Sequence, residues 1–102
     1  MKHLVIAEPA ARDLEAIIDY IALENPAAAE DVYRGIVGAS RKLPEFPALG
    51  RPGRHPETRE FSIPNLPYLI VYEVSANAVT ILAAFHTSRD LAKALRKRMN
   101  PS

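Results

Sequence analysis

The chain has 102 residues, of which 48% are hydrophobic and 25% charged, and it contains no cysteine. This length and composition predict one globular domain, residues 1–102, with a single modest core. The missing cysteine excludes disulfides and thiolate chemistry. No apolar run reaches the ~18 residues of a membrane span, and the apolar stretch near the amino terminus is too short for a signal peptide. We therefore expect a cytoplasmic protein.

The net charge of +1 hides an asymmetry between the two halves of the chain. Residues 1–50 carry 5 Lys/Arg and 8 Asp/Glu, whereas residues 51–102 carry 8 Lys/Arg and 4 Asp/Glu. The basic half could face a nucleic acid or an acidic protein, or it could be an ordinary solvated surface. Charge alone leaves these alternatives open.

Two helices are predicted in the first half, after a short strand at residues 3–7. Pro9 suits the first turn of a helix, and the apolar side chains that follow recur at helical spacing: Leu14, Ile17, Ile18 and Ile21. Asn25-Pro26 ends this helix, because the residue before a proline avoids the α region. A second helix runs from Pro26 to about Leu43. The short connection predicts an antiparallel helical hairpin lying on one face of a sheet.

Residues 44–56 contain four prolines and two glycines, so they can form neither a helix nor a central strand. We expect a surface loop that Phe46 and Leu49 pin to the core. Residues 58–63 alternate, which predicts a half-buried strand. Arg59 in this strand either crosses a groove to a partner carboxylate or pairs with an internal Glu60 or Glu73.

The remaining strands are more apolar. Residues 67–74 predict a central strand covered on both faces, and residues 79–86 predict the last strand. Between them lies a short loop in which Asn77 can take a left-handed conformation. Thr87-Ser88 offers a cap for a basic tail helix, residues 89–98, with Leu91 and Leu95 as its apolar contacts.

These elements predict an α+β fold of βααβββ order, with an antiparallel sheet packed against a two-helix hairpin and a short C-terminal helix. The hairpin occupies one face of the sheet. We expect the other face, and the groove beside the last strands, to stay available to a partner.

Motifs along almost the whole chain match a known family in order. They are Pro9-Ala10-Ala11-Arg12-Asp13-Leu14, Ile17, Tyr20-Ile21, Asn25-Pro26-Ala27-Ala28-Ala29, Leu43, Pro47, Gly50-Arg51-Pro52-Gly53-Arg54, Thr58-Arg59-Glu60, Tyr68-Leu69-Ile70-Val71-Tyr72, Val79-Thr80-Ile81-Leu82 and residues 86–89. No single motif is specific, but the ordered set resembles the RelE/ParE superfamily of toxins from bacterial type II toxin–antitoxin systems. The resemblance implies a small toxin that a cognate antitoxin neutralises by wrapping it with an extended or helical tail.

Two activities compete within that superfamily. RelE-like members cut messenger RNA in the ribosome, whereas ParE-like members inhibit DNA gyrase and cut no RNA. RelE-like nucleases resemble one another in a Tyr-Arg-Leu-Val-Tyr run whose arginine can stabilise the reacting phosphate. Here the run is Tyr68-Leu69-Ile70-Val71-Tyr72, and Leu69 cannot do so. The sequence therefore favours a ParE-like gyrase inhibitor without catalytic residues. A guanidinium beside His86 in place of the missing arginine would reverse this choice.

Two alternatives stay open. The first is a ribosome-dependent mRNA endonuclease using Arg59, His86 and Arg89, although His86 is more often a structural histidine at such a strand end. The second is a non-toxic partner that binds the antitoxin or regulates the operon.

For the binding surface, the resemblance and the charges together single out Arg51, Arg54, Arg59, Tyr68 and Arg89 as contacts for the antitoxin or target. An antitoxin that contacts the helical hairpin, the sheet edge and residues 51–59 would carry acidic and apolar residues there. We expect no cofactor, and His3 and His55 lack the spacing of metal ligands.

Overall fold

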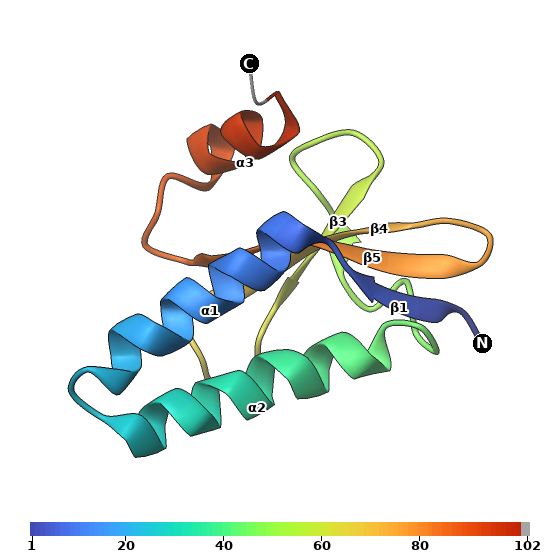
Figure 1. Ribbon diagram of the computed structural model, residues 1–102. Coiled ribbons are helices and arrows are strands. Elements are labelled where there is room, and N and C mark those ends of the chain that lie inside the picture. The colour runs from blue at the N-terminus through green and yellow to red at the C-terminus, as the bar shows by residue number, and fades with distance from the viewer. Residues whose placement is uncertain (101–102) are drawn as a thin grey trace.

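The chain forms a five-stranded sheet with a helical hairpin on one face and a short helix on the other (Figure 1). This computed structural model describes residues 1–100. Its elements are β1 (His3–Ile6), α1 (Glu8–Ala22), α2 (Pro26–Lys42), β2 (Arg51–Pro52), β3 (Thr58–Ser62), β4 (Tyr68–Val74), β5 (Ala78–His86) and α3 (Leu91–Met99). The strand order is β1-β5-β4-β3-β2, with β1 parallel to β5 and the other neighbours antiparallel. The predicted α+β fold is confirmed.

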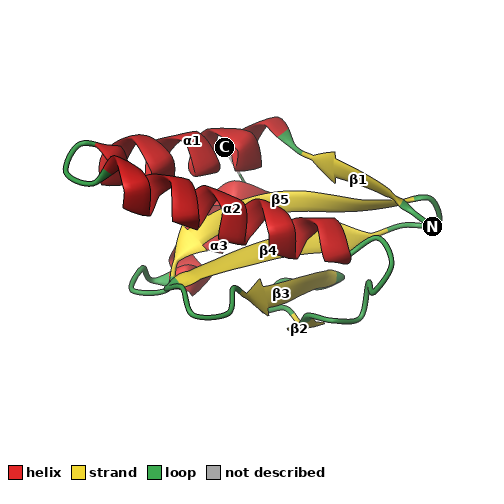
Figure 2. Cartoon of the chain, turned by 90° about the horizontal axis from the view of Figure 1, so that it is seen from below, coloured by secondary structure: helices red, strands yellow, loops and turns green. Residues whose placement is uncertain are grey.

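The helices α1 and α2 cover one face of the sheet side by side (Figure 2). The break between them lies where the sequence predicts it: Asn25 caps α2 by accepting a hydrogen bond from the Ala28 amide at 3.1 Å, and Pro26 begins the helix. Apolar side chains of α2 then pack on Ile70 and Tyr72 of β4 in the main core. None of the helices in residues 1–100 is long and apolar enough to cross a membrane.

The opposite face of the sheet is covered by α3, contrary to the prediction that it stays available to a partner. Leu69 and Phe85 belong to a second core with Ala94 and Leu95 of α3, so the predicted contact of Leu95 is confirmed. Phe85 and its neighbours are too apolar to face water, and the tail helix supplies the cover. The predicted cap of α3 is wrong: Asp90, not Thr87-Ser88, accepts a hydrogen bond from the Lys93 amide at 3.1 Å.

A bulge in β5 changes which residues face which helix. Tyr72 pairs with Ile81 and Val71 pairs with Ala83, so Leu82 is an extra residue without a partner on β4. Ile81 therefore faces the hairpin, and beyond the bulge Ala83 faces α3, although residues two apart on a regular strand share a face.

The loop before β3 is held differently from the prediction. Phe46 and Leu49 are 55% and 47% exposed, so they do not pin it. Instead, the buried Tyr72 hydroxyl donates to the Pro47 carbonyl at 2.7 Å and accepts from the Gly50 amide at 2.9 Å. The loop also contains the two-residue edge strand β2, which pairs with β3 and which the prediction missed.

The loop between β4 and β5 does not use the left-handed conformation predicted for Asn77. Among the described residues other than glycine, positive φ occurs at Glu57 and Asn65, each with φ 64°. Both lie in turns that flank β3 rather than in the β4–β5 hairpin. Asparagine tolerates the left-handed region better than most residues, but here it is Asn65 and not Asn77 that adopts it.

Candidate functional site

Leu69, which the sequence resemblance aligns with the arginine of RelE-like nucleases, is buried. Leu69 is 2% exposed and pairs across the sheet with Phe85, beneath α3. Two guanidiniums reach this area: Arg89 lies 5.0 Å and Arg98 lies 5.6 Å from the centre of the Phe85 ring. Both stack on an aromatic ring outside an apolar core. Neither occupies the place of a catalytic arginine, because Leu69 and its neighbours fill it.

His86 lies on the other face of the sheet from Leu69. It follows Phe85 directly in β5, and its ring meets Tyr68 edge-on at 5.2 Å between centroids. Its Nδ1 accepts a hydrogen bond from the Ser88 amide at 3.0 Å, so Nδ1 acts as the acceptor and Nε2 is the ring nitrogen left to donate. The sheet therefore separates His86 from the Arg89 guanidinium on Phe85, and the structure does not bring the two together.

Tyr68 and His86 line a pocket of about 480 Å³ at the end of the sheet, together with Ala16, Ile17, Tyr20, Ile21 and Ser88. Burial raises the pKa of the Tyr68 phenol above its ordinary value, and the proximity of Tyr20 raises it further. The phenol consequently stays protonated and can donate a hydrogen bond into the pocket.

The two loop arginines face one buried carboxylate. The Glu60 side chain is 1% exposed, and Arg54 reaches it twice: its Nη1 lies 2.7 Å from Oε1, and its backbone amide donates to Oε2 at 2.8 Å. Arg51 Nη2 lies 3.5 Å from the same Oε1, but its side chain is 65% exposed. Arg54 therefore stabilises the loop, whereas most of Arg51 remains accessible.

Arg59 is engaged with the backbone. Its Nε donates to the Gly50 carbonyl at 2.9 Å, and its Nη2 donates to the Ala48 carbonyl at 3.3 Å. Of the two alternatives for Arg59, pairing with Glu60 or Glu73 is wrong, because the guanidinium donates to the loop carbonyls instead, while contact with a partner carboxylate stays a prediction. Together with Tyr72, Arg59 fixes the loop that carries Arg51.

Sequence reasoning missed an ion pair that joins α1 to α3. The Arg98 guanidinium binds both oxygens of Asp13 at 2.7 and 2.8 Å and donates to the Leu82 carbonyl at 2.8 Å, while Asp13 also accepts from the Ala84 amide at 3.0 Å. We call these contacts the Asp13–Arg98 clasp. It satisfies the Leu82 carbonyl and the Ala84 amide, which lie beyond Ile81, the last residue of β5 that pairs with β1. The sequence signal was ambiguous, because Asp13 suits a helix start and Arg98 belongs to a basic run.

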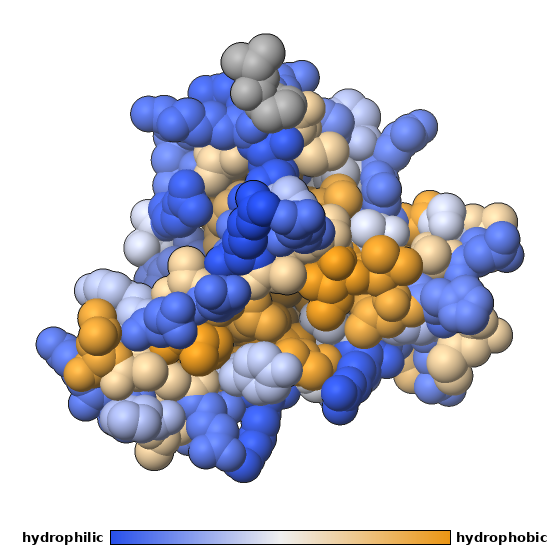
Figure 3. Space-filling view, viewed as in Figure 1, coloured by the Kyte–Doolittle hydropathy of each residue, from blue (hydrophilic) through white to orange (hydrophobic). Residues whose placement is uncertain are grey.

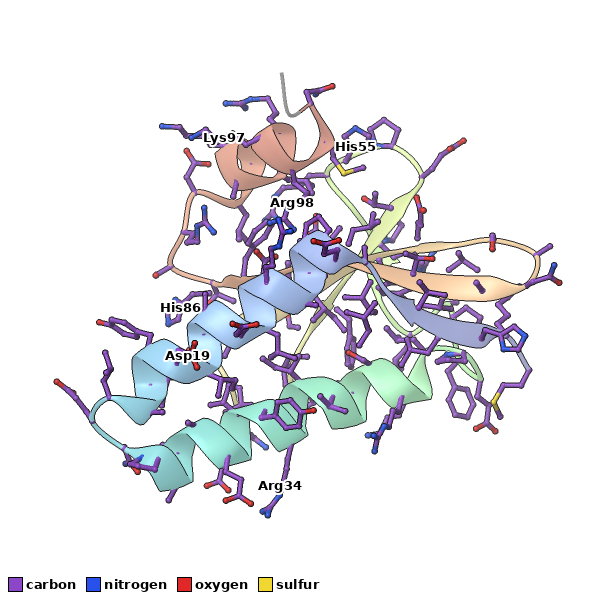
Figure 4. All side chains as sticks on the ribbon, in the orientation of Figure 1. Asp19, Arg34, His55, His86, Lys97 and Arg98 are labelled. Carbon is purple, nitrogen blue, oxygen red and sulfur yellow. The ribbon has the colours of Figure 1, made fainter. Side chains whose placement is uncertain are left out.

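An apolar groove of about 380 Å³ along the hairpin was also not predicted from the sequence. Its floor combines residues from β1, α1 and α2, with two carboxylates at its rim: Ile6, Ala11, Leu14, Ile18 and Tyr33, with Glu15 and Asp19. We call it the hairpin groove. Figure 3 shows apolar residues gathered on this side of the molecule, and Figure 4 places Asp19 on α1. Leu14 and Ile18 are predicted from their spacing as core residues, and they are only partly buried.

Residues 4–91 match the family model described as ParE toxin of type II toxin-antitoxin system, parDE. This chain belongs to the ParE toxin family. A curated protein of Sinorhizobium fredii strain NGR234, "Putative toxin Y4kP", is 40% identical over 86 residues, which cover 84% of this chain and 88% of that protein. Both results agree with the resemblance noted from the sequence.

Solved structures share the fold of this chain. The chromosomal ParDE TA system from P. aeruginosa matches with a TM-score of 0.78 and 26% identity, covering 84% of this chain and 96% of that one. The RelBE2 toxin–antitoxin complex from Mycobacterium tuberculosis matches with a TM-score of 0.57 and 21% identity over 83% and 96% of the two chains. The isolated E. coli RelE toxin matches with a TM-score of 0.54 and 15% identity over 97% and 99%. The last two likenesses show the shared fold.

Within the ParE family fold, the predicted site residues divide into separate groups. Arg51 is exposed on the β2 edge, Tyr68 lines the pocket with His86, and Arg89 stacks on Phe85. Arg54 and Arg59 hold the loop. Residues 1–100 contain no cluster of three or more His, Asp or Glu side chains that could bind a metal ion.

Proposed function

We propose that this ParE family toxin acts by binding DNA gyrase and blocking supercoiling, without cutting RNA. The observation that carries the proposal is Leu69, buried under α3 at the position where RNA-cutting relatives resemble one another in having an arginine. Cleavage by attack of a 2′-hydroxyl requires a base, an acid and cations around one phosphate. Here the histidine and the nearest guanidinium lie on opposite faces of the sheet, so they cannot serve one phosphate without rearrangement.

The test is a paired assay of the purified chain. The proposal expects inhibition of gyrase supercoiling and intact messenger RNA when cleavage is mapped on translating ribosomes. The variant His86→Ala separates the alternatives, because a nuclease using His86 would lose growth arrest while circular dichroism shows that the variant is folded. RNA cleavage by the unmodified chain, with supercoiling unaffected, refutes the proposal. Absence of growth arrest in cells lacking the antitoxin points instead to a non-toxic regulatory partner.

We further propose that a cognate antitoxin neutralises this toxin by laying an apolar helix face into the hairpin groove. An apolar floor that includes Tyr33 is the kind of surface that accepts an amphipathic helix. The carboxylates Glu15 and Asp19 at the rim favour basic residues beside that apolar face. At the β2 edge, the accessible Arg51 would pair with an acidic residue of the antitoxin.

Matched variants test the groove. Aromatic residues in such surfaces often dominate binding, so Tyr33→Ala should weaken the toxin–antitoxin complex by at least about tenfold, or about 1.4 kcal/mol. Leu23→Ala is the control, because Leu23 is an exposed apolar residue outside the groove. Equal affinity of both variants, measured by calorimetry, would remove the groove from the proposal. Arg51→Glu tests the electrostatic part of the proposal and should weaken the complex. Arg54 and Arg59 are less suitable, because they hold the loop and their replacement would also disturb its structure.

A further inference from the structure

The outer side of α3 carries a row of cations without partners. Lys93, Arg96 and Lys97 lie three and four residues apart, so they share one face of the helix. All three are exposed, and none forms an ion pair within residues 1–100. Figure 4 shows Lys97 pointing away from the body of the molecule, whereas Arg98 points toward α1. We call these three residues the α3 cationic stripe.

The positive surface continues from α3 onto the loop before β3. Arg96 lines a hollow of about 220 Å³ together with Arg54 and His55. Of the acidic groups nearby, Glu60 is buried against Arg54 and Asp90 caps α3, while Glu57 in the loop is exposed and forms no ion pair within residues 1–100. Little negative charge of the protein itself therefore offsets the α3 cationic stripe.

The composition of this surface identifies the kind of partner. In the described part of the chain, no large hydrophobic residue after Val74 is strongly exposed. The stable core of a protein–protein interface is apolar and poor in charge, whereas an interface with nucleic acid is polar and strongly positive. The α3 cationic stripe has cations and no apolar anchor. It therefore fits a phosphodiester backbone better than an acidic protein.

The shape of the element favours double-stranded DNA. The stripe lies on one α-helix on the side of the sheet away from the hairpin (Figure 1). The major groove of B-form DNA admits an α-helix, whereas the major groove of duplex RNA is deep and too narrow for side chains to read. We propose that the α3 cationic stripe binds the phosphate backbone of duplex DNA without sequence preference. This function is separate from gyrase inhibition and does not depend on it.

The experiment measures how binding depends on salt, without gyrase present. The full chain is titrated against a short fluorescein-labelled DNA duplex of mixed sequence, between about 50 and 200 mM salt. Each phosphate neutralised contributes about −0.9 to the slope of log affinity against log salt concentration. The variant Arg96→Gln/Lys97→Gln should therefore make that slope shallower by about 1.8.

The chain supplies a matched control. Arg41 and Lys42 are also adjacent, exposed and in the last turn of a helix, but on α2, and they too form no ion pair within residues 1–100. Arg41→Gln/Lys42→Gln removes the same charge and should leave the slope within error of the unmodified chain. Urea unfolding verifies that both variants are folded.

Four results would overturn the proposal. An unchanged slope in the Arg96→Gln/Lys97→Gln variant would show that the α3 cationic stripe does not contact phosphate. An equal fall in both variants would show a general effect of net charge. Tighter binding to duplex RNA, or displacement of the DNA by polyglutamate at equal charge concentration, would assign the surface to RNA or to an acidic protein.

Discussion

The Asp13–Arg98 clasp should contribute a large share of the stability of this small fold. Arg98→Ala removes the guanidinium from Asp13 and from the Leu82 carbonyl. Breaking a buried ion pair costs about 3–5 kcal/mol, because the remaining charge loses its partner. The side chains of Asp13 and Arg98 are 16% and 22% exposed, so water can partly solvate the Asp13 carboxylate left behind. We therefore expect a loss of about 2–3 kcal/mol in the free energy of unfolding, at or below the lower limit for a fully buried pair.

Urea unfolding followed by circular dichroism measures this loss. The midpoint of thermal unfolding shifts by about 4–8 °C per kcal/mol for a chain of this size, so it should also fall by at least about 8 °C. Arg96→Ala on the same helix is the control, because Arg96 is exposed without an ion pair in residues 1–100, and its effect should stay within about 0.5 kcal/mol.

A double-mutant cycle with Asp13→Ala isolates the pair from other effects of each substitution. If the residues act on each other as the distances indicate, the coupling free energy should exceed about 1 kcal/mol. An Arg98→Ala protein as stable as the Arg96→Ala control would refute the reasoning. Additive effects of the two substitutions would instead place the stabilisation in the backbone hydrogen bonds alone.

Three further predictions concern the residues around the loop and the pocket. Tyr72→Phe leaves the Pro47 carbonyl and the Gly50 amide without their partner, so urea unfolding should show a loss of about 2–4 kcal/mol. Gly50→Ala brings a Cβ to 2.7 Å from both the Glu60 carbonyl oxygen and the Tyr72 hydroxyl, so it should lower the free energy of unfolding by about 1–3 kcal/mol in the same assay. Gly38→Ala is the control and should not destabilise the chain, because a Cβ at Gly38 meets nothing within 4 Å. Because the pKa of Tyr68 is raised in the folded chain, the unfolded chain releases the phenol proton at lower pH. The stability that follows from this difference is present below about pH 10 and is lost as the pH rises further. Urea unfolding at several pH values should show this loss in the unmodified chain and not in Tyr68→Phe.

The sequence was sufficient for the elements whose signals are local. Asn25-Pro26 marks the break between the helices, and the run from Tyr68 to Tyr72 marks a strand buried on both faces, as the structure confirms. Proline chemistry and hydrophobic spacing act within a few residues, so they can be recognised without knowing the fold.

Features that depend on distant partners could not be predicted in this way. The Arg59 guanidinium can donate to carboxylates or to backbone carbonyls, and only the position of the loop decides for the Gly50 carbonyl. Likewise, the basic run at the chain end contains both Arg98, which is held by Asp13 from the far end of the sequence, and Lys97, which faces outward. Nothing in the run itself distinguishes the two.

The β5 strand illustrates a further reason. Its continuous apolar sequence conceals the bulge at Leu82, since either face would accept residues such as Ala83 and Ala84. Without that bulge, His86 would be assigned to the wrong side of the sheet, and its separation from Leu69 could not be seen. The candidate site was therefore predictable in composition but not in arrangement.

Leu82, the extra residue of β5, has a consequence for how this strand tolerates a change in its length. Deleting Leu82 would join Ile81 directly to Ala83, so that the pairs Tyr72–Ile81 and Val71–Ala83 would follow one another in a regular ladder and the later residues of β5 would keep their present faces. His86 would therefore still pair with Tyr68, on the face of the sheet opposite Leu69 and the Arg89 guanidinium. Only a shift of the β4–β5 pairing by one residue beyond Leu82 would place the imidazole beside Leu69, so the extra residue can be lost without moving any later side chain to the other face of the sheet.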